Sequence, residues 1–128
     1  MLEYSKEQAM TEKTKIDMTI YNLQAEISKT LANPIRLAIL HNLKETEKSV
    51  NELTDTLGLS QSNISQHLAI MRQVGIVKTR KQATNIFYSV TNPKINQACD
   101  IVREVLIDQL NQKQELAADI NKNSRGNY

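Results

Sequence analysis

The chain has 128 residues, enough for one compact domain, and its single cysteine excludes an intramolecular disulfide and indicates a reducing, intracellular setting. Aromatic residues make up only 4% of the chain, so the core is lean and would gain stability from oligomerisation. The net charge of +2 excludes nothing by itself, but no apolar run approaches the length of a membrane span, and a cytoplasmic location is expected.

Hydrophobic spacing and capping residues predict the first two helices. Residues 16–31 carry apolar side chains at steps of three and four, which predicts an amphipathic helix. Asn33 is a suitable N-cap for a second helix, with Pro34 at its first position. This second helix is apolar on nearly every side as far as Leu43, so it is predicted to be the central buried helix.

Two shorter helices follow over residues 49–74 and predict a helix-turn-helix. Ser49 caps the first of them, and Gly58 ends it in the left-handed conformation. Ser60 caps the second helix, which Gly75 ends. The side chains expected to face the core are apolar in both helices: Val50, Leu53, Leu57, Ile64, Leu68, Met71 and Val74.

The periodicity then changes from that of a helix to that of strands. Residues 76–90 predict a β-hairpin, the wing, with a polar turn that contains no glycine, so Asn85 or a longer loop must make the bend. Asn92 and Pro93 start a long last helix over residues 92–121. The polar residues 124–128 predict a disordered tail.

The order of elements, α-α-α-α-β-β-α, predicts a mainly α fold with a small β-hairpin, a single winged helix-turn-helix domain over residues 1–123. In such a fold the second helix of the helix-turn-helix enters the major groove of DNA. Its exposed arc carries hydroxyl and carboxamide groups, which hydrogen-bond base edges, and the predicted base-reading residues are Gln61, Ser62, Ser65 and Gln66. An ordinary solvated helix face is the alternative.

Positive charge concentrates on the same part of the chain. No acidic residue lies between Asp55 and Asp100, whereas five basic residues do, so this interval has a net charge of +5. The rest of the chain has 11 basic and 14 acidic residues and a net charge of −3. Such a polarised segment is typical of a surface that meets phosphate, although chance can also produce it. The residues predicted to contact the DNA backbone, two of them at the hairpin tip (Arg80 and Lys81), are Ser60, Arg72, Lys78, Arg80 and Lys81.

Three stretches, LANPIRLAIL, SQSNISQHL and GIVKTRKQATNIFYSV, resemble the ArsR-type (ArsR/SmtB) winged-helix repressors of bacteria and archaea. The resemblance covers about residues 28–108. It implies a homodimer built from the first and last helices that binds a pseudo-palindromic operator in double-stranded DNA, usually as a repressor relieved by an effector. The apolar stripes of the two terminal helices are independently compatible with dimerisation.

The metal sites of that family are missing from the sequence. The segment that matches the family's cysteine pair reads SVNELTDTL, and the start of the last helix reads TNPKINQACDIVREVLIDQL, with no histidine. No metal and no cofactor are therefore expected. His41 is interpreted as a structural residue, and His67 as a packing or phosphate-contacting one. Cys99 is the remaining sensor candidate, with a small buried hydrophobe as its alternative and repression without an effector left open.

No feature of the sequence indicates an enzyme. There is no glycine-rich phosphate loop, and the spacing brings no histidine beside a nucleophile. The function predicted from the residues and the resemblance is a sequence-specific DNA-binding transcriptional regulator. A winged-helix module that binds a protein rather than reading DNA is the alternative.

Overall fold

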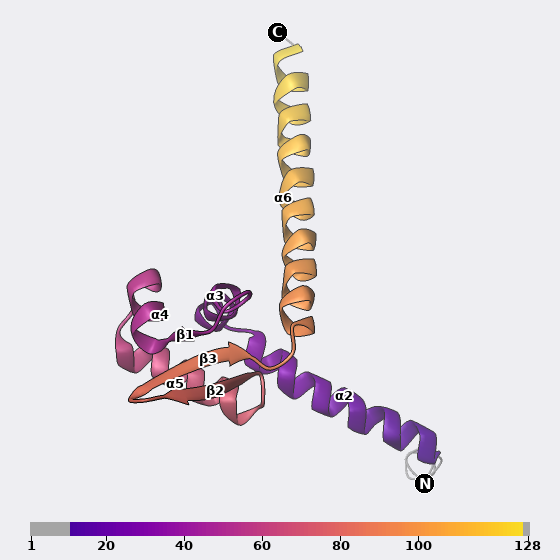
Figure 1. The fold of residues 1–128 in the computed structure, drawn as a ribbon. Helices are drawn as coiled ribbons and strands as arrows, with labels where there is room; N and C mark the ends of the chain where they lie inside the picture. Colours follow the sequence, from indigo (N-terminus) through magenta and orange to yellow (C-terminus); the bar gives the residue numbers. More distant parts are fainter. Residues whose placement is uncertain (1–10, 127–128) are drawn as a thin grey trace. The chain divides into compact units, whose positions relative to one another are not determined.

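The computed structural model describes residues 11–126 of the chain, which divides after Thr91 into two units. Among the described residues, the first unit holds four helices and a small sheet, and the second holds one long helix (Figure 1). In chain order the elements are α2 (Glu12–Leu31), α3 (Pro34–Asn42), β1 (Lys48–Ser49), α4 (Val50–Leu57), α5 (Gln61–Gln73), β2 (Val77–Gln82), β3 (Asn85–Val90) and α6 (Lys94–Gly126).

Side chains cap the helices at the residues that the sequence predicts. Asn33 Oδ1 accepts hydrogen bonds from the backbone N–H groups of Ile35 (2.9 Å) and Arg36 (3.2 Å). The hydroxyls of Ser49 and Ser60 each accept a backbone N–H three residues on, at 3.2 Å. These bonds satisfy donors that the first turn of a helix leaves free, so the starts of α3, α4 and α5 are locally encoded. Helix α2 begins earlier than predicted, at Glu12.

The sheet has three strands rather than the predicted two. Its order is β1-β3-β2, with both pairings antiparallel. Strand β1 is only Lys48 and Ser49, which pair with Tyr88 and Phe87, and Ser49 also caps α4. Two residues give no periodic signal, so this strand depends on the presence of β3 as a partner.

The bend of the wing is made by Ala83, not by Asn85. Gln82 pairs with Asn85 in the last rung of the ladder, so the turn consists of Ala83 and Thr84 alone. A two-residue hairpin turn needs a positive φ at its first central residue, and Ala83 has φ 54°. The sequence favours Asn85 because asparagine tolerates that conformation, but the register places it in the strand.

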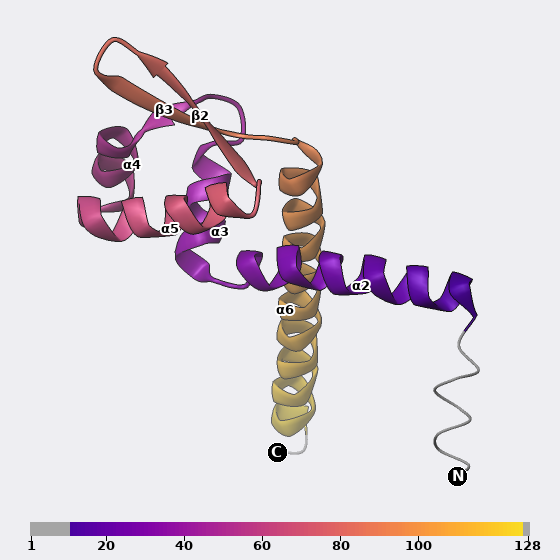
Figure 2. The same cartoon turned by 90° about the horizontal axis from the view of Figure 1, so that it is seen from below.

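Helices α3, α4 and α5 lie together on one side of the sheet (Figure 2). The buried apolar core is formed by Ile39, Leu40, Leu43, Leu53, Ile64, Leu68, Met71, Ile76 and Val77. The sequence predicts that α3 is the central buried helix, but one of its apolar side chains faces solvent, because Leu37 is 40% exposed. Val74 is 39% exposed because it is the C-cap of α5 rather than part of its buried stripe. Val50 and Leu57 are only half-buried.

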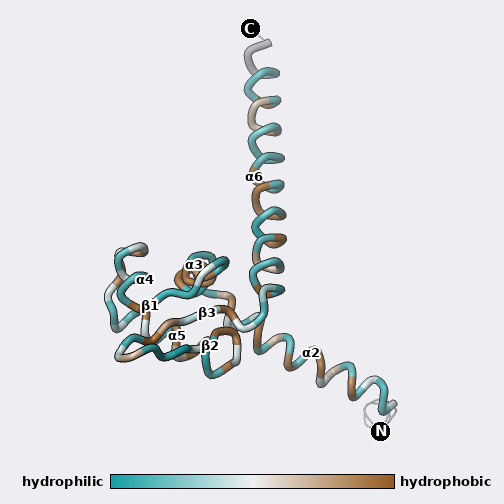
Figure 3. Tube along the Cα trace, in the orientation of Figure 1, coloured by the Kyte–Doolittle hydropathy of each residue, from teal (hydrophilic) through white to brown (hydrophobic). Residues whose placement is uncertain are grey.

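The second unit is helix α6, which has 33 residues and is about 50 Å long at 1.5 Å per residue. It continues to Gly126, so the helix includes residues 124–126 of the segment predicted as a disordered tail, and Asn127 and Tyr128 lie outside the described residues. Apolar bands recur along α2 and along α6 (Figure 3). No helix within residues 11–126 is apolar over a stretch long enough to cross a bilayer.

Candidate nucleic-acid interface

Helix α5 is anchored by one face and exposed on the other. Ile64, Leu68 and Met71 have no exposed surface, because they lie at helical steps of four and three facing the core. The opposite face therefore points to solvent. The four residues predicted to read bases are all exposed. Ser62, Ser65 and Gln66 lie on this face, and Gln61 lies at its margin. Their donor and acceptor groups are available to a base edge without any rearrangement of the core.

The start of α5 suits an anion. The hydroxyl of Ser60 caps the helix and lies 3.3 Å from the hydroxyl of Ser62. No acidic residue is present in the first turn, so the partial positive charge of the helix N-terminus is not neutralised locally. Arg72 is exposed in the last turn of the same helix. Both ends of α5 therefore carry groups that favour phosphate.

Strand β2 distributes its basic residues over both faces of the wing. Alternation in a strand puts Lys78, Arg80 and Gln82 on one face and Thr79 and Lys81 on the other. Arg80 pairs with Phe87, two rungs before the closing pair, so it lies farther from the tip than the sequence suggested. Lys81, opposite Ile86, lies one rung before the closing pair.

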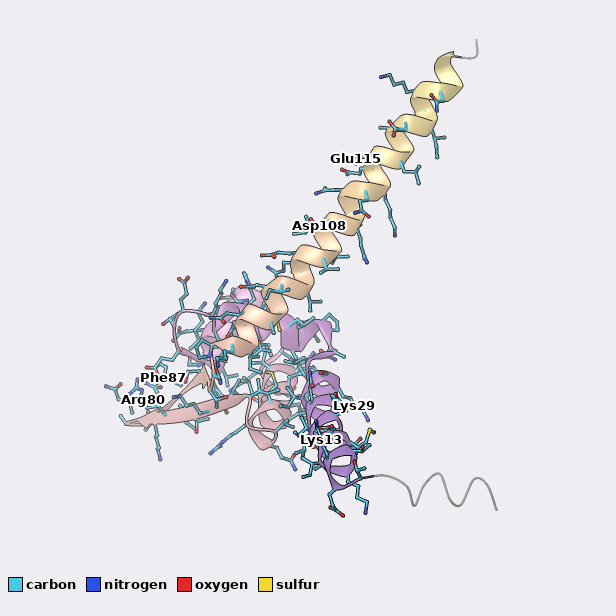
Figure 4. The ribbon with its side chains drawn as sticks, turned by 90° about the vertical axis from the view of Figure 1, so that its right-hand side faces the viewer. Lys13, Lys29, Arg80, Phe87, Asp108 and Glu115 are labelled. Atoms are coloured by element: carbon cyan, nitrogen blue, oxygen red, sulfur yellow. The ribbon has the colours of Figure 1, made fainter. Side chains whose placement is uncertain are left out.

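Arg80 is held by an acidic partner that the sequence does not reveal. Its Nε lies 3.1 and 3.0 Å from the two carboxylate oxygens of Glu47, and its Nη2 also forms an ion pair with that group. Nη1 donates to Gln82 Oε1 at 3.0 Å, and the guanidinium lies 5.0 Å from the ring centre of Phe87. Figure 4 shows Arg80 and Phe87 together on the hairpin. The hydrogen bond from Arg80 lowers the pKa of Glu47 and raises that of Arg80.

A second cluster joins three helices. Arg36 donates from Nε to His67 Nδ1 at 3.1 Å and from Nη1 to the carbonyl of Thr30 at 3.1 Å. Burial lowers the pKa of His67, and the charge of Arg36 lowers it further. His67 is thus a half-buried acceptor in α5, which supports a packing role over a contact with phosphate. No sequence signal identified Arg36, because His67 lies 31 residues away.

Cys99 is half-buried in α6. Burial raises the pKa of its thiol, the charge of Asp100 raises it further, and Arg103 has a smaller opposing effect. A raised pKa disfavours the thiolate, which is the reactive form. These features support the alternative that Cys99 is a small hydrophobe.

A capped helix with an exposed polar face, set beside a basic hairpin, defines a winged helix-turn-helix DNA-binding protein. The chain belongs to the ArsR family of bacterial regulatory proteins. The family described as "Bacterial regulatory protein, arsR family" matches residues 33–79, which include α3, the helix-turn-helix and the start of β2. The resemblance found in the sequence is confirmed, and with it the fold class and the assignment as a transcriptional regulator rather than an enzyme.

Relatives of known name agree with this family. The HTH-type transcriptional regulator Rv0081 of Mycobacterium tuberculosis is 37% identical over 102 residues, which are 79% of this chain and 90% of that protein. Its crystal structure superposes with a TM-score of 0.66 at 39% identity, covering 73% of this chain and 95% of the other. The crystal structure of the transcriptional repressor BigR from Xylella fastidiosa superposes with a TM-score of 0.61 at 37% identity, covering 75% of this chain and 96% of BigR. The homodimeric winged helix-turn-helix domain of Mb0332 from Mycobacterium bovis shares the fold, with a TM-score of 0.68 at 22% identity, covering 80% and 92%.

Proposed function

We propose that the protein is a homodimeric repressor that binds a pseudo-palindromic operator, with one α5 in each of two successive major grooves. The observation that carries this proposal is the exposed polar face of α5, fixed to the core by Ile64, Leu68 and Met71. A reading helix needs such anchoring because base contacts depend on its orientation. The named relatives include repressors and also a transcriptional activator, HlyU of Vibrio cholerae, so they support regulation of transcription, and repression is part of the proposal.

The proposed base-reading residues are Gln61, Ser62, Ser65 and Gln66. A glutamine carboxamide bridges N6 and N7 of adenine, and serine hydroxyls contact several bases. Ser60, Arg72, Lys78, Arg80 and Lys81 are the proposed backbone contacts, which add affinity for any sequence. Arg80 must leave Glu47 to make its contact, whereas Lys81, on the other face of β2, is exposed.

We also propose dimerisation through α2 and α6. Both helices expose apolar side chains along their length, which a soluble monomer would not retain without a partner. On α2 the exposed apolar side chains include Ile16, Ile20, Leu23 and Ile27, and on α6 they include Val102, Val105, Leu106 and Leu110. A second subunit that covers these stripes would supply the apolar burial that the lean core lacks.

The proposed regulator does not use the metal sites of its family. Within residues 11–126 no group of three or more His, Cys, Asp or Glu side chains is placed to hold a metal ion.

The winged-helix domain is proposed to extend over residues 1–123, with α6 as part of the dimer. The protein is proposed to act in the cytoplasm.

The test is a fluorescence-anisotropy titration of the purified protein against DNA from its own upstream region and against a scrambled fragment of equal length. A preference of about tenfold or more, equivalent to about 1.4 kcal/mol, supports sequence reading. Binding should also weaken steeply with salt because phosphate contacts release counterions. Weak, salt-insensitive binding to both fragments, and to fragments selected from the whole genome, would favour the protein-interaction alternative.

A further inference from the structure

The carbonyl of Thr30 lacks its usual helical partner. It lies in the last turn of α2, and the residue four positions on, which would normally donate an N–H to it, is Pro34. Thr30 is only 7% exposed, so water has little access to the carbonyl. Nη1 of Arg36 donates to it at 3.1 Å. The end of α2, followed by Pro34, thus leaves a carbonyl acceptor that a side chain of α3 satisfies.

The same guanidinium reaches the recognition helix. Its Nε donates to Nδ1 of His67, in the middle of α5, at 3.1 Å. The N–H groups of a guanidinium point in fixed directions, so Arg36 cannot follow a shift of one partner without weakening its bond to the other. Arg36 itself is anchored because its backbone N–H donates to the cap residue Asn33 at 3.2 Å. One side chain therefore ties the end of α2 to α5.

This arrangement specifies the state of His67. Nδ1 accepts a hydrogen bond only when it carries no proton, so the ring is neutral with its proton on Nε2. His67 follows Gln66, a proposed base-reading residue, so a rotation of α5 about its axis that moves one moves the other. The bond between Arg36 and His67 then acts together with the buried residues Ile64, Leu68 and Met71 to set the position of Gln66.

We propose that Arg36 is a positioning residue that links the dimerisation helix α2 to the recognition helix α5 through Thr30 and His67. This rests on the proposed function, because it assigns Arg36 the role of carrying the placement of α2, when it packs against a second subunit, to the face that reads bases. A role limited to closing the end of α2 would affect stability but not the preference for the operator.

The test uses a matched pair of substitutions at His67. In His67→Asn the side-chain oxygen can take the place of Nδ1 and still accept from Arg36, whereas in His67→Gln the longer side chain places its amide near the position of Nε2. Each variant, together with Arg36→Lys, is titrated against the operator and the scrambled fragment. Thermal unfolding and sedimentation equilibrium report the fold and the dimer of each.

The expected result is that His67→Asn keeps the operator preference of the wild type within about threefold, whereas His67→Gln and Arg36→Lys each lower that preference by about tenfold. The folded dimer should persist in all three. Nitrogen chemical shifts of His67 in the wild type should show an unprotonated Nδ1 and a protonated Nε2. Where Arg36→Lys does not fold, the His67 pair and the chemical shifts decide.

The inference is overturned if the two His67 variants behave alike, if His67→Gln keeps the preference and His67→Asn loses it, or if Nδ1 is protonated. A wild-type protein without any preference would instead contradict the proposed function itself. The two failures are therefore distinguishable.

Discussion

Substitution of Glu47 by glutamine should tighten DNA binding. In the free protein the carboxylate of Glu47 holds Arg80 through Nε and Nη2, so a phosphate must displace it. A glutamine side chain at this position would occupy the same volume but would carry no charge to compete with phosphate. Arg80 would then contact the DNA backbone without losing an ion pair.

The exposure of the pair limits the expected gain. The side chains of Arg80 and Glu47 are 50% and 35% exposed, so water and salt screen their attraction. Exposed ion pairs of this kind correspond to a change of about 1.5- to 5-fold in an equilibrium constant. Each subunit of a dimer would contribute once, so the affinity should rise by about 2- to 25-fold. The gain should be the same for operator and scrambled DNA because phosphates carry no sequence information.

The assay is anisotropy at several salt concentrations, with Glu45→Gln as the matched control. Glu45 is exposed in the same loop, so its substitution removes the same charge without altering the contact to Arg80. Arg80→Ala alone should reduce the slope of log K against log salt by about 0.9 per subunit. In the Arg80→Ala background Glu47→Gln should have no more effect than Glu45→Gln. Equal gains from Glu47→Gln and Glu45→Gln in the wild-type background would refute the competition, because general charge would then explain both.

Four further outcomes are expected. Gln66→Ala should lower the preference for the operator by about 1–3 kcal/mol, whereas Arg72→Ala should weaken binding to operator and scrambled DNA alike. If Gln66→Ala lowers the affinity for both fragments equally, base reading by Gln66 is contradicted. Gly58→Ala should lower the free energy of unfolding in urea by about 1–2 kcal/mol, because φ is +67° and no atom within 4 Å of the new Cβ adds a clash. The pKa of His67 lies below its usual 6.5 in the folded state, so the unfolded state takes up the proton first as the pH falls. The free energy of unfolding should therefore fall as the pH drops below 6.5 and level off below the folded-state pKa. His67→Asn should abolish this pH-dependent part of the free energy of unfolding. Alkylation of Cys99 should be slow at pH 8, and an oxidant should change operator affinity by less than about twofold; release of DNA would identify Cys99 as a sensor.

Several features of the fold could be predicted because neighbouring residues encode them. The caps at Asn33, Ser49 and Ser60 act on N–H groups two or three residues away, and Gly58 adopts its left-handed conformation within the turn itself. The buried stripe of α5 follows from helical spacing alone. From these local signals came the helix-turn-helix, the wing, the family and the polar face of α5.

The remaining features depend on residues far apart in the chain. Strand β1 exists only because β3 returns beside it, and the register of β2 and β3 decides that Ala83 rather than Asn85 makes the bend. The exposure of Leu37 depends on which helices surround α3. No pattern in the residues themselves predicts such neighbours, because a strand pairing or a packing contact is selected by the whole chain.

The candidate interface likewise has features that local periodicity predicts and contacts that depend on distant residues. The sequence by itself determined which polar and basic residues lie on the recognition helix and the wing, since helical and strand periodicity assign each residue to a face. Only the tertiary structure decided which of these side chains are already engaged. Arg80 meets Glu47 across 33 residues and Arg36 meets His67 across 31, because packing of separate elements brings these groups within hydrogen-bonding distance.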